Sequence, residues 1–133
     1  MRLKSFMILL LLLILTTLNG CSTKNKSSDL TYSKITSEEA NEMMEDDNSI
    51  TILDVRTAEE YNSGHIEGAI NIPDTEIVDK ALELLDDKTD TILVYCRSGR
   101  RSALAAANLV KLGYTNVYDF GGIIDWEYDI VTN

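Results

Sequence analysis

The sequence predicts a single α/β domain built on a largely parallel sheet with helices on both faces. Three observations predict this fold class. The chain has 133 residues, a length that suits one domain. Short apolar runs alternate with helical patterns along it, as they do in parallel α/β folds. Its clearest strand, residues 91–95, is almost entirely apolar, which is typical of a strand buried on both faces.

Two helix starts are predicted from capping signals. Thr36 and Glu39, and later Thr57 and Glu60, have the three-residue spacing of a capping box. We expect the first helix to extend to about Asp46 and the second to be brief.

The remaining elements are predicted from apolar runs and from apolar residues repeating every 3.6 positions. The expected strands span residues 50–55, 69–73, 91–95 and 117–120. The expected later helices span residues 74–86, 102–112 and 123–128. Ligands of such sheets bind beyond the carboxyl ends of the strands. Cys96, directly after the clearest strand, therefore lies where chemistry is expected.

Residues 1–20 are typical of an export signal. Arg2 and Lys4 precede ten unbroken apolar residues. An uncleaved membrane anchor is the alternative, and the run is short for it, since a spanning helix needs about 20 residues. The next residues, Leu18-Asn19-Gly20-Cys21, resemble the lipobox of bacterial lipoproteins, in which the cysteine is lipidated and begins the mature chain.

This resemblance implies that lipid on Cys21 anchors the protein to a bacterial cell membrane, facing outward. Residues 21–32 are then the lipidated cysteine and a flexible polar tether, and residues 33–130 form the domain. With Cys21 alkylated, Cys96 is the only free thiol. A lone thiol in an exported protein indicates reactivity or intermolecular pairing, unless it is simply a small buried apolar residue.

Composition excludes several functions. The net charge of −10 argues against nucleic acid as a partner, since such binding needs a basic face. One histidine rules out histidine-rich metal sites, and the acidic runs lack the spacing of cation ligands. Motifs for zinc proteases, P-loop NTPases and dinucleotide binding are absent from the sequence. We expect neither a metal nor a cofactor.

The segment from Cys96 to Ser102 carries the expected chemistry. It reads Cys96-Arg97-Ser98-Gly99-Arg100-Arg101-Ser102. It joins a buried strand to a helix start, where unpaired backbone N–H groups and the helix dipole form an anion cradle. Gly99 permits a positive φ, and Ser102 is the expected N-cap. A thiol in such a cradle is stabilised as thiolate, which is a nucleophile and accepts a sulfur atom.

Four segments in this order resemble single-domain sulfurtransferases of the rhodanese family. They are residues 54–56, residues 64–73, the Cys96 loop and residues 121–126. The resemblance covers most of residues 33–128. It implies a five-stranded, mainly parallel sheet and a persulfide on Cys96. It further implies that sulfur moves from a small anionic donor such as thiosulfate to cyanide or a thiol, with a protein as a possible acceptor.

Residue roles follow from this resemblance. Cys96 attacks the outer sulfur of the donor, and no general base is needed if its thiol is already ionised. Residues Arg97, Ser98, Gly99, Arg100 and Arg101 supply the N–H groups of the cradle. The side chain of Arg101, with Arg97 or Arg100 as further candidates, attracts the donor and stabilises the departing sulfite. The alternative for these arginines is exposed, solubilising charge.

Supporting roles are assigned to residues outside the loop. We expect Asp54, at a strand end near the same edge, to pair with a loop arginine. Arg56 is expected to pair with Glu59 or Glu60. His65 is interpreted as a structural residue of a turn and not as a catalytic base.

Two alternative functions remain open. One is a non-enzymatic sulfur relay or binding module, which passes its persulfide to a partner protein. The other is a cysteine phosphatase, which resembles this loop but places five residues between its cysteine and its arginine. Here Arg101 follows Cys96 after only four residues, and five would lead to Ser102. The shorter loop favours a sulfur atom or a sulfonate over a phosphate.

Overall fold

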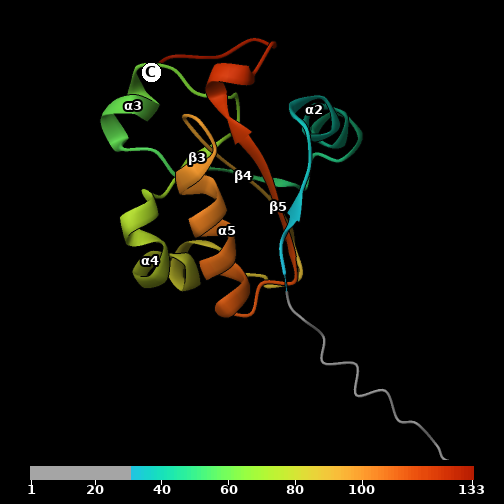
Figure 1. Ribbon diagram of the computed structural model, residues 1–133, viewed down its shortest axis with the longest axis vertical. Helices are drawn as coiled ribbons and strands as arrows, with labels where there is room; N and C mark the ends of the chain where they lie inside the picture. The colour runs from blue at the N-terminus through green and yellow to red at the C-terminus, as the bar shows by residue number, and fades with distance from the viewer. Residues whose placement is uncertain (1–30) are drawn as a thin grey trace, which may run out of the picture.

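The computed structural model describes residues 31–133 and shows one sheet with helices on both sides (Figure 1). The sheet has five strands in the order β1-β5-β4-β2-β3, and every neighbouring pair is parallel. The predicted fold class is thereby confirmed. The export signal, Cys21 and most of the tether lie outside the described residues.

The strands and helices alternate along the chain, as the sequence predicts. The strands are β1 (Ser33–Lys34), β2 (Thr51–Asp54), β3 (Ile70–Asn71), β4 (Thr91–Cys96) and β5 (Asn116–Gly122). The helices are α2 (Ser37–Asp46), α3 (Ala58–Asn62), α4 (Ile77–Leu84) and α5 (Arg100–Lys111), with 3-10 turns η1 (Asp74–Glu76) and η2 (Ile123–Asp125). None of the helices within residues 31–133 combines the length and apolar character needed to span a bilayer.

Both predicted capping boxes are present. Thr36 accepts the backbone N–H of Glu39 at 3.1 Å, and the Glu39 carboxylate accepts the N–H of Thr36 at 2.7 Å. In α3 the corresponding distances between Thr57 and Glu60 are 3.2 and 3.0 Å. Each box satisfies two N–H groups that a helix start leaves without partners.

Three elements differ from the expectation. β1 was not predicted, because its two exposed residues carry no apolar signal and only backbone pairing with β5 defines it. The last expected helix is only the turn η2, since Trp126 returns to extended backbone. Helix α5 begins at Arg100 and not at residue 102, because Gly99, with φ of +100°, occupies the N-cap position.

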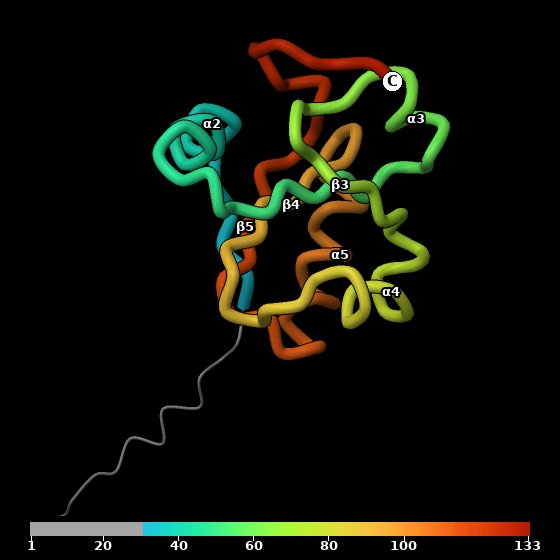
Figure 2. Tube along the Cα trace, turned by 180° about the vertical axis from the view of Figure 1, so that it is seen from behind, coloured from blue at the N-terminus to red at the C-terminus, as the bar shows by residue number. Residues whose placement is uncertain are grey.

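Each face of the sheet carries its own apolar core. Residues of α4 and α5, such as Ala81 and Leu109, pack on one face with Val94 and Cys96 of β4. On the other face, Ala40 of α2 packs with alternate residues of β4. Figure 2 shows α2 on the side of the sheet opposite to α4 and α5. All of β4 after Thr91 is buried, which places its carboxyl end, and Cys96, under the following loop.

Candidate active site

Cys96 is the last residue of the central strand β4. A register shift between Val94 and Cys96 interrupts the pairing with β5, and Cys96 then lies opposite Gly122. Cys96 is only 1% exposed, and part of its surroundings is the apolar cluster beneath α5. The backbone N–H of Gly99 nevertheless donates to the Sγ atom at 3.0 Å. One amide of the predicted loop, that of Gly99, therefore reaches the sulfur.

The loop can fold back on Cys96 because two glycines, Gly99 and Gly122, allow its backbone to turn and to approach β5 closely. Gly99 has a φ of +100°, which side-chain-bearing residues rarely adopt. A Cβ atom on Gly122 would lie 2.2 Å from the carbonyl oxygen of Arg97, so only glycine fits there. Ile124 donates its N–H to that same oxygen at 3.2 Å. The end of β5 and the turn after it thus support the loop, a role that the pair Gly121-Gly122 in the sequence could have indicated.

Ser102 lies beneath the sulfur and is not the N-cap. Its Oγ atom is 3.6 Å from Sγ of Cys96, and its hydroxyl can donate to the carbonyls of Gly99 at 3.1 Å and Gly121 at 3.3 Å. The prediction of an N-cap was wrong because Gly99 ends the loop earlier and makes Ser102 the third helical residue. The side chain instead points into the junction of loop, helix and β5.

The surroundings of Cys96 act on its pKa in opposite directions. Burial raises the pKa of the thiol, because it disfavours the charged form. Hydrogen bonds from the backbone and hydroxyl of Ser102, and from the backbones of Gly99 and Ser98, lower it. The hydrogen bonds prevail, and the pKa of Cys96 lies below its ordinary value. The contacts therefore increase the fraction of Cys96 that is thiolate at a given pH.

Arg101 forms a bidentate ion pair with Glu60 of α3. Both Nη atoms of Arg101 donate to the two carboxylate oxygens, each at 2.8 Å. The Arg101 hydrogen bonds lower the pKa of Glu60 to about 2, and the same contacts raise the pKa of Arg101. The prediction that Arg56 pairs with Glu59 or Glu60 is wrong, because Arg56 pairs with Asp54. The remaining loop arginines, Arg97 and Arg100, are exposed beside the site, as is Ser98.

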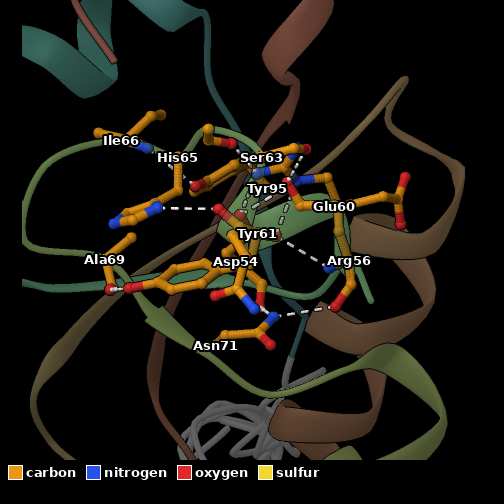
Figure 3. Close-up of polar contacts among 12 residues, drawn as sticks. Asp54, Arg56, Glu60, Tyr61, Ser63, His65, Ile66, Ala69, Asn71 and Tyr95 are labelled. Carbon is orange, nitrogen blue, oxygen red and sulfur yellow. Dashed lines mark hydrogen bonds and ion pairs between the residues drawn. The ribbon is translucent and has the colours of Figure 1, made fainter. Parts of the chain in front are cut away.

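Asp54 does not pair with a loop arginine, contrary to the prediction. Its carboxylate accepts Nε of Arg56 at 3.0 Å and Nη2 at 2.6 Å, and both residues are buried. The two residues are close in sequence, so the guanidinium turns back on its own strand end. Arg56 also donates to the carbonyl of Gly64 at 2.7 Å. Figure 3 shows Asp54 and Arg56 at the centre of this buried network.

The network ties the segment after α3 to the sheet. Tyr95 of β4 accepts the N–H of Ile66 at 3.1 Å. His65 lies with Nδ1 2.9 Å from the carbonyl oxygen of Tyr61, and its ring stacks on the Tyr61 ring at 3.7 Å. The backbone of His65 also pairs with Val131. These contacts agree with the structural role expected of His65 (Figure 3).

The site places a cysteine sulfur, a potential nucleophile, beside backbone N–H groups and basic side chains. Amides and a hydroxyl meet at a buried sulfur, and basic side chains lie around the loop. Within residues 31–133, no group of histidine, cysteine, aspartate and glutamate side chains is arranged to hold a metal ion.

The chain is similar to known proteins in sequence and in fold. Residues 36–129 match the model of the rhodanese-like domain. The chain is 44% identical over 73 residues to "Thiosulfate sulfurtransferase PspE" of Escherichia coli (strain K12), covering 55% of this chain and 70% of that protein. It is 39% identical over 106 residues to "Putative sulfur carrier protein YrkF" of Bacillus subtilis (strain 168), covering 79% of this chain and 55% of that protein.

A solved structure described as a rhodanese with anions from E. coli superposes with a TM-score of 0.59 at 39% identity, covering 63% of this chain and 99% of that one. The family model spans more than half of the chain, and the relatives include a protein named as a thiosulfate sulfurtransferase. The protein described here belongs to the rhodanese-like family.

Proposed function

We propose that the protein is a sulfurtransferase that carries sulfane sulfur as a persulfide on Cys96. The observation that supports this proposal most strongly is the Gly99 amide, which donates to the Cys96 sulfur at 3.0 Å, with the Oγ atom of Ser102 3.6 Å from the same sulfur. Those groups stabilise a thiolate before the reaction and an anionic persulfide after it. The likeness to a thiosulfate sulfurtransferase supports the choice of donor.

The reaction needs no external oxidant or reductant. The Cys96 thiolate attacks the outer sulfur of thiosulfate, a sulfur–sulfur bond to Cys96 forms, and the bond from that sulfur to the sulfite group breaks. Its electron pair leaves with sulfite, so Cys96 is left as an anionic persulfide. A cyanide ion or a thiolate then attacks the outer sulfur and restores the Cys96 thiolate. The lowered pKa of Cys96 raises its thiolate fraction at a given pH, and in this proposal no general base takes part.

Intact mass spectrometry tests this proposal. The purified protein should gain the mass of one sulfur atom after thiosulfate and lose it after cyanide, with thiocyanate appearing in solution. Cys96→Ala should show neither change, because it lacks the acceptor atom. A wild-type protein that keeps its mass in thiosulfate, or a variant that still yields thiocyanate, would refute the proposal.

A second candidate is a sulfur relay, supported by the likeness to a protein named as a sulfur carrier. A relay would form the same persulfide but would turn over slowly with cyanide or small thiols. Comparing the rate of persulfide formation with the rate of thiocyanate release separates the two functions. Rapid loading followed by negligible release would favour the relay.

We further propose that the protein is exported and held at the bacterial membrane by lipid on Cys21. The support is the sequence of residues 1–21 alone. Cys21→Ser should move the protein from the membrane fraction to the soluble fraction and abolish incorporation of labelled palmitate. Retention of the variant in the membrane fraction would argue for anchoring by the apolar segment itself.

A further inference from the structure

We propose that Glu60 is a positioning residue that fixes Arg101 beside Cys96 and offsets its charge, so that the site releases sulfite readily. The proposal rests on the sulfurtransferase function proposed above and extends it to a residue outside the catalytic loop. The sequence predicts that the side chain of Arg101 attracts the donor, and the structure shows that side chain already paired with Glu60.

The carboxylate of Glu60 is fully engaged. One oxygen accepts an Arg101 Nη atom and the backbone N–H of Thr57, and the other accepts the second Nη atom of Arg101. The Arg101 side chain is 22% exposed and the Glu60 side chain 30%, so water screens the pair only in part. A bidentate pair of this kind fixes the orientation of the guanidinium as well as its distance.

Glu60 is itself held in place by the fold. It is the third residue of α3 and closes the capping box with Thr57. The segment after α3 is attached to the sheet through the contact of Arg56 with Gly64 and through the Tyr61 hydroxyl, which donates to the carbonyl of Ala69 at 2.6 Å. The Arg101–Glu60 ion pair therefore joins helix α5 to helix α3, which is itself held against the sheet. The two residues are 41 positions apart in sequence.

The Arg101–Glu60 ion pair affects the chemistry because it changes the net charge beside Cys96. Arg101 is the second residue of α5, directly after the loop that follows Cys96. Its hydrogen bonds to Glu60 are the main cause of its raised pKa, and the negative charge of the Cys96 sulfur adds to them. After transfer, sulfite carries two negative charges and the persulfide one. An unpaired arginine would hold sulfite and slow its departure, since bidentate guanidinium contacts to oxyanions are strong. Glu60 offsets that attraction while the loop amides, which carry no net charge, still orient the donor.

Glu60→Gln and Glu59→Gln form a matched pair of variants for the test. Both remove one negative charge from α3, and glutamine at the third position preserves the capping box. Glu59 is exposed one residue away, so its variant controls for the change in overall charge. Thermal unfolding of both variants verifies that the fold is kept.

The first measurement is inhibition of thiocyanate formation by sulfite. In Glu60→Gln the inhibition constant for sulfite and the KM for thiosulfate should both fall about two- to fivefold, without a rise in kcat. Glu59→Gln should match the wild type. Equal constants in all three proteins, or weaker inhibition in Glu60→Gln, would overturn the proposal.

The second measurement does not depend on sulfur transfer. Sulfate, used as an unreactive anion at constant ionic strength, should protect Cys96 from iodoacetamide at lower concentrations in Glu60→Gln than in the wild type. Equal protection in the two would contradict the proposed role of Glu60. Failure of the wild type to form a persulfide would instead refute the proposed function, and the protection assay would still report on Glu60.

Discussion

Cys96 occupies two environments at once. Its strand and the helix above it place it in the apolar core, with 1% of its surface exposed. The loop that follows returns the amide of Gly99 to its sulfur, and the Oγ atom of Ser102 in α5 lies 3.6 Å from that sulfur. Burial alone would make it an inert thiol, and the loop alone would leave a thiolate open to water. The combination gives a stabilised anion that solvent reaches poorly.

The Ser102 hydroxyl contributes to this stabilisation, which leads to a prediction at the residue scale. Ser102→Ala removes a side chain whose contact lowers the pKa of Cys96, so that pKa should rise, and alkylation by iodoacetamide at a pH just below it should slow several-fold. At high pH, where the thiol is ionised in both proteins, the rates should converge. The pH dependence of alkylation measures the shift, and unchanged curves would show that the backbone amides suffice.

The helix α3 is only five residues long, and its capping box matters accordingly. Short helices are marginal without caps or tertiary contacts. The same Glu60 carboxylate closes the box and holds Arg101, so the stability of α3 and the geometry of the site are coupled. In α2 an identical box, made by Thr36 and Glu39, stands apart from the catalytic loop.

This pair of boxes supplies a prediction at the element scale. Thr57→Ala and Thr36→Ala should each lower the free energy of unfolding by about 1 kcal/mol, because each loses a side-chain cap. Only Thr57→Ala should alter the kinetics of sulfite inhibition, since only that box includes a partner of Arg101. Urea titration and steady-state assays check the two effects. An equal kinetic effect in Thr36→Ala would show that loss of stability, and not the position of Glu60, is responsible.

At the scale of the whole molecule, the buried ion pair of Asp54 and Arg56 stabilises the connection between two segments of the chain. Both side chains are almost completely buried, and the arginine also holds the carbonyl of Gly64. Removing one partner leaves the other charge in the interior without compensation, which costs more than the intact pair contributes. The pair therefore secures the connection between β2 and the α3 segment.

At the scale of the molecule we predict that Arg56→Met lowers the free energy of unfolding by about 3–5 kcal/mol. The control is Lys80→Met on α4, which breaks the exposed ion pair between Lys80 and Glu76. This change should lower the free energy of unfolding by less than about 1 kcal/mol. Urea unfolding followed by circular dichroism measures both. Similar losses in the two variants would mean that the interior pair is as well screened as a surface pair.

The sequence by itself determined what depends on neighbours along the chain: the alternation of strands and helices, both capping boxes, and an anion-binding loop after the strand that ends in Cys96. The alternation and the boxes follow from local backbone preferences and apolar periodicity, and the anion-binding role of the loop is the prediction that the proposed assays test. Only the tertiary structure decided the partners. Arg101 forms an ion pair with Glu60, and Arg56 forms one with Asp54. The carbonyl of Arg97 packs against Gly122, where a side chain would not fit. Such choices depend on which elements the strand order brings together, and many carboxylates in this acidic chain were equally plausible partners for each arginine.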